Sequence, residues 1–297
     1  MNQAGQVVAQ LETQDPVLPP RAISWWQGVV VAGLVGFLYY SILGRLVLDW
    51  WNDPNFSHGF FVPLFSGFLL WVERKRLAGI TPRPSWFGLV VVAGALVILL
   101  VGVFGAELFL SRSSLLFLLA GLIIYFQGWP FFRAVFFPWI FLFLMIPIPS
   151  IIFNQITFPL QLLASRLASA VLPVLNVPVL REGNVIQLPA MPLEVAEACS
   201  GIRSLMSLGT LAIIYGYFLE NRVLGRVLLV LASVPIAVAA NALRIVGTGL
   251  LVQYWDPHKA LGFFHEFSGW VIFMTSLALL LAVHGLLRLV AGKEQAH

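Results

Sequence analysis

Charge and cysteine are both scarce in this sequence. Only 10% of its 297 residues are charged, whereas 60% are apolar, and this balance excludes a soluble globular protein with a largely polar surface. The single cysteine, Cys199, excludes a framework of intramolecular disulfides and leaves one thiol that chemistry could use. No internal repeat and no segment with the composition of a soluble catalytic domain is visible. Any reaction must therefore be carried out by residues within or next to the apolar segments.

The apolar residues come in long runs that predict membrane-spanning helices. A helix needs about 20 mostly apolar residues to cross a hydrocarbon core of roughly 30 Å. The sequence therefore predicts an all-α, polytopic transmembrane helix bundle with about eight spans, over 22–44, 54–72, 84–106, 113–132, 134–153, 204–219, 227–243 and 267–287. Residues 1–24 are expected to form a flexible cytoplasmic tail, residues 25–288 the membrane domain, and residues 289–297 a second cytoplasmic tail.

The net charge of +4 is explained by topology. With a cytoplasmic N-terminus, the loops predicted inside carry ten of the seventeen basic residues, as the positive-inside rule requires. Both termini are therefore predicted to lie in the cytoplasm. The ten residues are Arg21, Arg74, Lys75, Arg76, Arg83, Arg133, Arg222, Arg226, Arg288 and Lys293.

The longest segment predicted outside, 154–198, departs from the pattern of spans. Its first part, 155–175, mixes polar and apolar residues and predicts a helix that lies in the membrane interface. Residues 179–195 contain a Glu-Gly-Asn turn signal and predict a short extended flap before the sixth span. The flap leads to Cys199, so a peptide substrate could add to it as an extended strand; an ordinary loop is the alternative.

Ionisable groups within spans cost roughly 2.5 to 3.5 kcal/mol each on insertion scales, so each is a functional hypothesis. Cys199 is expected in the first turn of the sixth span, where the helix dipole favours a thiolate, and Arg203 lies four residues on, on the same face. Arg203 could hold the thiolate or pair with Glu194 or Glu197. In the alternative interpretation, Cys199 is a packing residue and Arg203 is a snorkelling anchor.

Two further polar positions are predicted at the same outer face. Asn241 and Arg244 lie about one turn apart on the seventh span, and Arg244 is expected near the outer surface. An asparagine is costly in lipid, so Asn241 should face the interior of the bundle. His265 lies at the outer start of the eighth span. For Arg244 a snorkelling side chain is the alternative, and for His265 an interfacial residue with no further role.

The junction of the first two spans carries a fourth group of polar residues. Asp53, Ser57 and His58 lie there among aromatic residues. The aromatics are typical of an interfacial belt, and the three polar residues could also line the outer cavity.

Together, Cys199, Arg244 and His265 provide the groups that acyl transfer needs. They are a thiol nucleophile, a guanidinium that can stabilise an oxyanion, and an imidazole that can take and return a proton. No cofactor and no metal is required. A secondary transporter would also use intramembrane polar groups, but it predicts repeats and a midplane site. A metal-dependent protease is weakly indicated because no histidine pair has the His-Glu-x-x-His spacing.

Four short motifs resemble the exosortase and archaeosortase family of membrane transpeptidases. They are Glu-Ala-Cys-Ser-Gly-Ile-Arg ending at Arg203, Asn-Ala-Leu-Arg-Ile from Asn241, His265 with Gly269, and Ser-His-Gly from Ser57. The first motif is fairly specific, and the others gain weight from their order and spacing. The resemblance covers most of the membrane domain, but the additional C-terminal domain of some members is not seen.

The resemblance implies that Cys199 is the nucleophile, Arg244 the essential arginine and His265 the third member, as in the bacterial branch. It implies substrates that are exported proteins with a C-terminal sorting signal, made of a motif such as Pro-Glu-Pro, a transmembrane helix and a basic cluster. The new C-terminus would pass to a lipid or another surface acceptor, often alongside exopolysaccharide production. The expected location is the bacterial inner membrane, with the active site facing the periplasm and no nucleic-acid partner. A cysteine protease that releases its product to water remains the alternative.

Overall fold

The computed structural model describes residues 25–195, 201–255 and 263–294, with the backbone alone at 263–266, 268 and 289–294. Within these residues, seven helices are long and apolar enough to cross a membrane. The prediction of an all-α multi-pass bundle is therefore confirmed. The chain forms two compact units, one of Met1–Leu48 with Phe60–Ile146 and one of Asp49–Gly59 with Pro147–His297.

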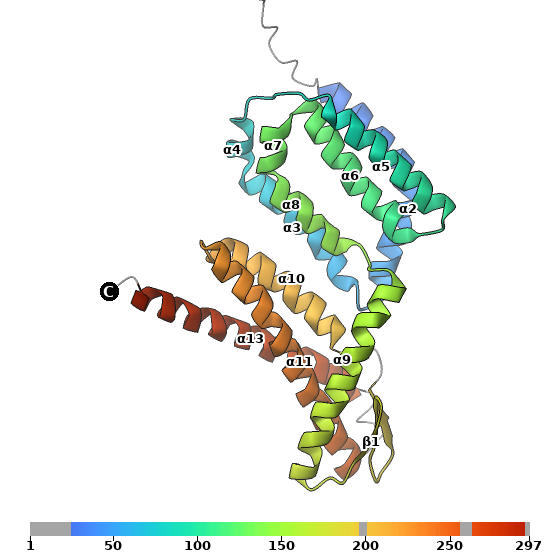
Figure 1. The fold of residues 1–297 in the computed structure, drawn as a ribbon, viewed down its shortest axis with the longest axis vertical. Helices are drawn as coiled ribbons and strands as arrows, with labels where there is room; N and C mark the ends of the chain where they lie inside the picture. The colour runs from blue at the N-terminus through green and yellow to red at the C-terminus, as the bar shows by residue number, and fades with distance from the viewer. Residues whose placement is uncertain (1–24, 196–200, 256–262, 295–297) are drawn as a thin grey trace, which may run out of the picture. The chain divides into compact units, whose positions relative to one another are not determined.

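Three long helices make the core of the first unit (Figure 1). They are α2 (Trp25–Asn52), which ends in the second unit, α5 (Phe87–Phe104) and α6 (Leu108–Phe126). Tyr39 of α2 is fully buried among Ala95, Leu99 and Leu115. Its hydroxyl lies 2.9 Å from the hydroxyl of Ser114, because a polar group buried in lipid needs a partner.

Shorter helices complete the first unit, and they replace the predicted span over 134–153. Pro138 explains the break, because a proline ring clashes with the carbonyl four residues earlier, and the helix before it ends at Ala134. Ile146 is extended, as a residue before proline tends to be. The short elements are η1 (Ser57–Phe60), which lies mostly in the second unit, α3 (Phe61–Val72), α4 (Arg74–Ala78), α7 (Trp129–Ala134), α8 (Phe136–Phe141) and η2 (Leu142–Met145).

Helices of the second unit carry the candidate site. They are α9 (Ser150–Val171) with η3 (Leu172–Leu175), α10 (Ile202–Leu219), α11 (Val223–Tyr254) and α13 (Phe263–Glu294). The interfacial helix predicted over 155–175 is longer than expected. It begins at Ser150, and with η3 it reaches 26 residues, a length sufficient to cross a membrane.

The predicted flap over 179–195 is a three-stranded antiparallel sheet in the order β1-β2-β3. Its strands are β1 (Leu180–Glu182), β2 (Val185–Gln187) and β3 (Pro192–Glu194). Gly183, at φ +64°, occupies the first central position of the β1–β2 turn, where a two-residue hairpin favours glycine. In the pairing of β2 with β3, Ile186 lies opposite Leu193.

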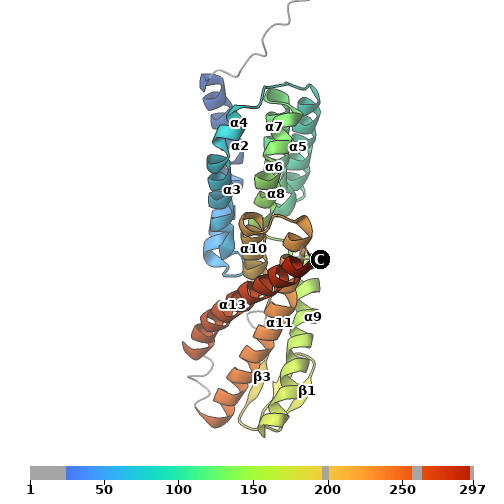
Figure 2. The same ribbon diagram turned by 90° about the vertical axis from the view of Figure 1, so that its left-hand side faces the viewer.

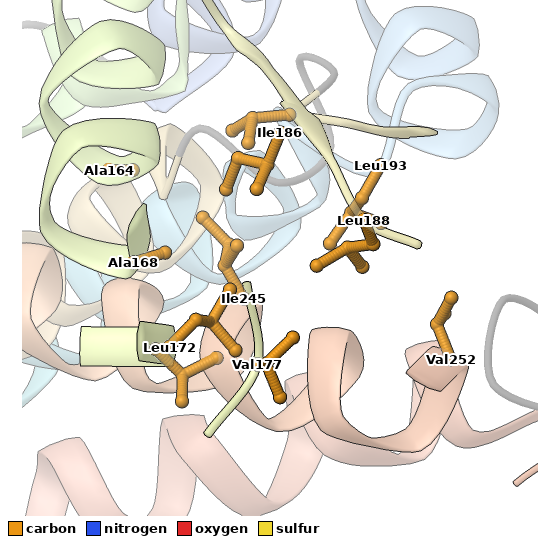
Figure 3. Packing of buried hydrophobic residues seen from close by; sticks show 11 residues of the cluster. Ala164, Ala168, Leu172, Val177, Ile186, Leu188, Leu193, Ile245 and Val252 are labelled. Atoms are coloured by element: carbon orange, nitrogen blue, oxygen red, sulfur yellow. The ribbon is translucent and has the colours of Figure 1, made fainter. Parts of the chain in front are cut away.

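The 32-residue helix α11 packs in two different environments along its length. Its first part packs with α10 and α13, through Leu229 and Ala237. Its last part packs with α9 and the sheet, through Ile245, Val246 and Val252 (Figure 3). Figures 1 and 2 show the same division, with α10 beside the first part of α11 and α9 beside the last. The segment around Asn241 and Arg244 lies at this boundary.

Candidate active site

The start of α10 is fixed by a glycine that contacts α11. Gly201 precedes the helix with φ +81° and ψ −2°, a conformation that residues with a Cβ rarely adopt. A Cβ on Gly201 would lie 3.1 Å from both Cβ and Cγ of Asn241 and 3.3 Å from its Nδ2. The Cys-Ser-Gly motif therefore ends directly on the Asn-Ala-Leu-Arg motif, because only a glycine allows this close approach.

Asn241 is buried, with 2% of its surface exposed, which confirms the expectation that it faces the protein interior. Arg244 is half-buried and lies three residues further along α11, so the two side chains share one face of the helix. The polar face of α11 that carries Asn241 and Arg244 therefore lies next to the start of α10 and not beside the middle of that helix.

A second glycine contact joins α11 to α13. A Cβ on Gly269 would lie 3.2 Å from Nη2, 3.4 Å from Cζ and 3.7 Å from Nη1 of Arg244. The guanidinium therefore lies in close contact with α13 at Gly269, where a side chain would meet it. His265 is in the first turn of the same helix, and positions four residues apart share a helix face. The face of α13 that carries His265 is consequently the face that Arg244 contacts.

The site thus brings together three of the motifs singled out from the sequence. Two of the predicted residues, Cys199 and Glu197, lie outside the described residues. For His265 the structure gives the backbone position alone.

Comparison with protein families gives an independent assignment. The family model of the transmembrane exosortases matches residues 50–282. This chain belongs to that family. The matched range contains every predicted site residue, from Asp53 to His265. Comparisons with the curated proteins and with the solved structures return no match.

In this exosortase, Arg203 and Glu194 lie on different elements. Arg203 is exposed in the first turn of α10, and Glu194 is the last residue of β3, with an exposed side chain. Among the described residues, no ion pair joins them. A pairing of Arg203 with Glu194, with Glu197 or with Cys199 stays a prediction.

The loop at 53–59 belongs to the same unit as the site. Asp53 accepts a hydrogen bond from the backbone N–H of Asn55 at 2.8 Å, and the Ser57 hydroxyl donates to the carbonyl of Pro54 at 3.0 Å. These two side chains shape the turn. His58 is buried, and the loop packs on α9 through the rings of Phe56 and Phe153, 5.6 Å apart. A role of the three polar residues in substrate binding stays a prediction.

The sequence did not predict a partly buried polar cluster at the other end of α10. The hydroxyl of Tyr215 lies 2.7 Å from Nδ1 of His284, and Nε2 of His284 is 3.4 Å from the Glu220 carboxylate. The backbone N–H of Arg222 donates to Glu220 and is the main cause of the lowered pKa of this carboxyl. The sequence does contain an indication of this cluster, because His284 is an ionisable residue within the span predicted over 267–287.

Proposed function

We propose that this exosortase is a cysteine-dependent transpeptidase that cleaves the C-terminal sorting signal of exported proteins and transfers the new C-terminus to a surface acceptor. The observation that carries the proposal is the pair of glycine contacts. Gly201 lies against Asn241, and Gly269 lies against Arg244. Through these contacts, three segments that are far apart in the sequence meet at one end of α10.

Cys199 is the proposed nucleophile. It precedes Gly201 by two residues, and two residues of extended chain span at most roughly 7 Å. Gly201 itself lies against Asn241, one helical turn from Arg244. The thiolate attacks the scissile carbonyl, and the bond to the amine breaks to leave a thioester on Cys199.

Arg244 and His265 carry the two supporting roles. The Arg244 guanidinium stabilises the oxyanion of the tetrahedral intermediate, a type of interaction that contributes about 10²- to 10³-fold to the rate. His265 gives a proton to the departing amine and then removes one from the acceptor nucleophile. The acceptor attacks the thioester carbonyl, forms the new bond and restores the thiol. Hydrolysis differs only in that water is the acceptor.

The charge distribution supports a placement in the inner membrane. Ten of the seventeen basic residues lie in loops on one side of the expected eight-span topology. If that side is the cytoplasm, as the positive-inside rule favours, both termini are cytoplasmic and the start of α10, next to Arg244 of α11, faces the periplasm. The proposed substrates are exported proteins that end in a short motif such as Pro-Glu-Pro, a transmembrane helix and a basic cluster. The acceptor is a lipid or another surface molecule.

A tagged candidate substrate expressed with the enzyme tests this function. Variants Cys199→Ala, Cys199→Ser, Arg244→Ala and His265→Ala are compared with Arg166→Ala, a matched control because Arg166 is exposed on α9. We expect no processing with the Cys199 variants, a loss of about 10²-fold or more with Arg244→Ala, and normal processing with the control. Membrane abundance is checked by immunoblot.

The mass of the product's new C-terminus separates the two enzymatic outcomes. A free carboxylate indicates hydrolysis, and a covalently attached acceptor indicates transfer. Normal processing by Cys199→Ala at normal abundance contradicts the nucleophile assignment and reopens the transporter and metal-protease alternatives.

A further inference from the structure

The pairing register of the sheet determines which backbone groups β3 presents outward. The N–H of Val195 donates to the carbonyl of Asn184 at 2.9 Å, and the N–H of Leu188 donates to the carbonyl of Met191 at 3.3 Å. Backbone groups of successive residues in a strand point to opposite edges. Residues 191, 193 and 195 therefore point toward β2, and residues 192 and 194 point away from it.

Glu194 consequently presents both its N–H and its C=O at the outer edge of β3. Pro192 presents only a carbonyl there, because proline has no N–H. Within the described residues, no strand pairs with this edge, since β3 is the last strand of the sheet. An edge strand with outward-pointing groups is a template for another extended chain.

The same strand is anchored beside the candidate active site. Leu193 and Val195 are buried in one hydrophobic cluster with Ile245 and Val246 of α11, and Figure 3 labels Leu193 and Ile245 in this cluster. Ile245 follows Arg244 directly. The side chains of Pro192 and Glu194 lie on the other, exposed face of the sheet. β3 is therefore packed in the same cluster as the residue that follows Arg244.

We propose that this edge binds the extended segment of the polypeptide substrate as a fourth strand. The proposal rests on the proposed function, which supplies a polypeptide whose scissile bond must reach Cys199, five residues beyond Glu194. One residue of the substrate exchanges two hydrogen bonds with Glu194, and Pro192 accepts a third. Because Pro192 offers no N–H, the edge holds the substrate with few bonds, which suits a peptide that must leave after transfer.

Cysteine cross-linking tests the docking separately from catalysis. Cys199 is the only cysteine, so Glu194→Cys in a Cys199→Ala chain has a single thiol and binds without turning over. The probe is the tagged reporter with single cysteines scanned through ten positions before its transmembrane helix. We expect cross-links at alternate positions, because side chains of an added strand alternate between its faces. Arg181→Cys, on the exposed outer strand β1, is the matched control and should give none.

Proline substitution tests the same edge with active enzyme. Glu194→Pro removes an N–H that points away from β2, so every ladder bond of the sheet is retained. We expect roughly tenfold slower processing, as the loss of one hydrogen bond and the added ring predict. More reporter should restore the rate, because binding is impaired. Arg181→Pro removes the equivalent outward N–H at the other edge of the sheet and should process the reporter at the wild-type rate.

Three outcomes would overturn the proposal. They are cross-links at every position without alternation, cross-links from Arg181→Cys in place of Glu194→Cys, and equal rates for the two proline variants at equal abundance. If only the strand-docking proposal is wrong, the wild-type enzyme processes the reporter normally but the Glu194→Cys chain gives no alternating cross-links. Failure of the proposed function appears as an absence of processing by the wild-type enzyme.

Discussion

Replacement of Gly201 by alanine is the most direct probe of the contact between α10 and α11. The change adds one methyl group and no charge, and it lies two residues from Cys199. Two effects act together. The backbone must hold φ +81° with a Cβ present, and this Cβ must fit 3.1 Å from Cβ and Cγ of Asn241.

The structure gives the size of each effect. Left-handed backbone costs a residue with a Cβ about 1 to 2 kcal/mol. Ordinary carbon contacts are about 3.5 to 4.0 Å, so the start of α10 must also move by a few tenths of an ångström or more. A displacement of about 1 Å near the reacting groups can cost roughly 10²-fold in rate. We therefore expect Gly201→Ala to slow processing by about 10- to 100-fold.

Pulse-chase processing of the reporter measures the effect, with enzyme abundance determined in the same membranes. Gly209→Ala is the matched control on α10, because its Cβ would meet nothing closer than the Ser233 hydroxyl at 3.9 Å. It should process normally. In Gly201→Ala with Asn241→Gly, the side-chain contact is removed and the backbone strain remains, so we expect partial recovery. Wild-type rates in Gly201→Ala at normal abundance would refute the argument that this contact positions the nucleophile.

Three further predictions follow from the packing and the charges. Gly269→Leu should displace the Arg244 guanidinium and lower the processing rate about as much as Arg244→Ala; an unchanged rate would show that this contact does not position the arginine. Gly88→Ala should lower the melting temperature in detergent, corresponding to roughly 1 to 3 kcal/mol, because the new Cβ overlaps the backbone of Tyr125, whereas Gly94→Ala, in open space, should not. The pKa of Glu220 is lowered in the folded protein, so the ionised carboxylate stabilises the fold at neutral pH. This stabilisation is lost as the pH falls from about 4.5, the ordinary pKa of the group, through its lowered pKa in the folded protein. Glu220→Gln should therefore have a lower melting temperature than the wild type at pH 7, and the difference should vanish in acid.

Much of the fold could be predicted from hydropathy, because a membrane span needs only length and apolarity. There are two exceptions. The span predicted over 54–72 is η1 followed by the 12-residue helix α3, which together are shorter than a span, and the second exception lies between Ala134 and Leu175. The apolar run over 134–153 is as hydrophobic as a span, but Pro138 and the Pro-Ile-Pro segment at 147–149 divide it into short pieces. Prolines were visible in the sequence, so a stricter use of their steric effect would have found the break and the longer helix after it.

The candidate site could be predicted only in part. Its approximate location followed from the expected topology, which placed Arg244 and His265 at the same end of their helices. The close contacts at Gly201 and Gly269 could not be predicted, because they depend on how α10 and α13 cross α11. A sequence specifies which face of a helix is polar, but the crossing point depends on packing among all three helices.

The length of α11 supports the proposed role of Arg244. Its neighbour α10 has 18 residues and spans about 27 Å at about 1.5 Å per residue, close to the thickness of a hydrocarbon core. The 32 residues of α11 reach about 48 Å, and its last part packs with α9 and the sheet. Arg244 thus lies level with the start of α10, so its charge avoids the cost of the centre of the hydrocarbon thickness that α10 matches. A substrate whose cleavage motif directly precedes a transmembrane helix would present its scissile bond at this same depth, because its own helix must fill the same thickness of hydrocarbon.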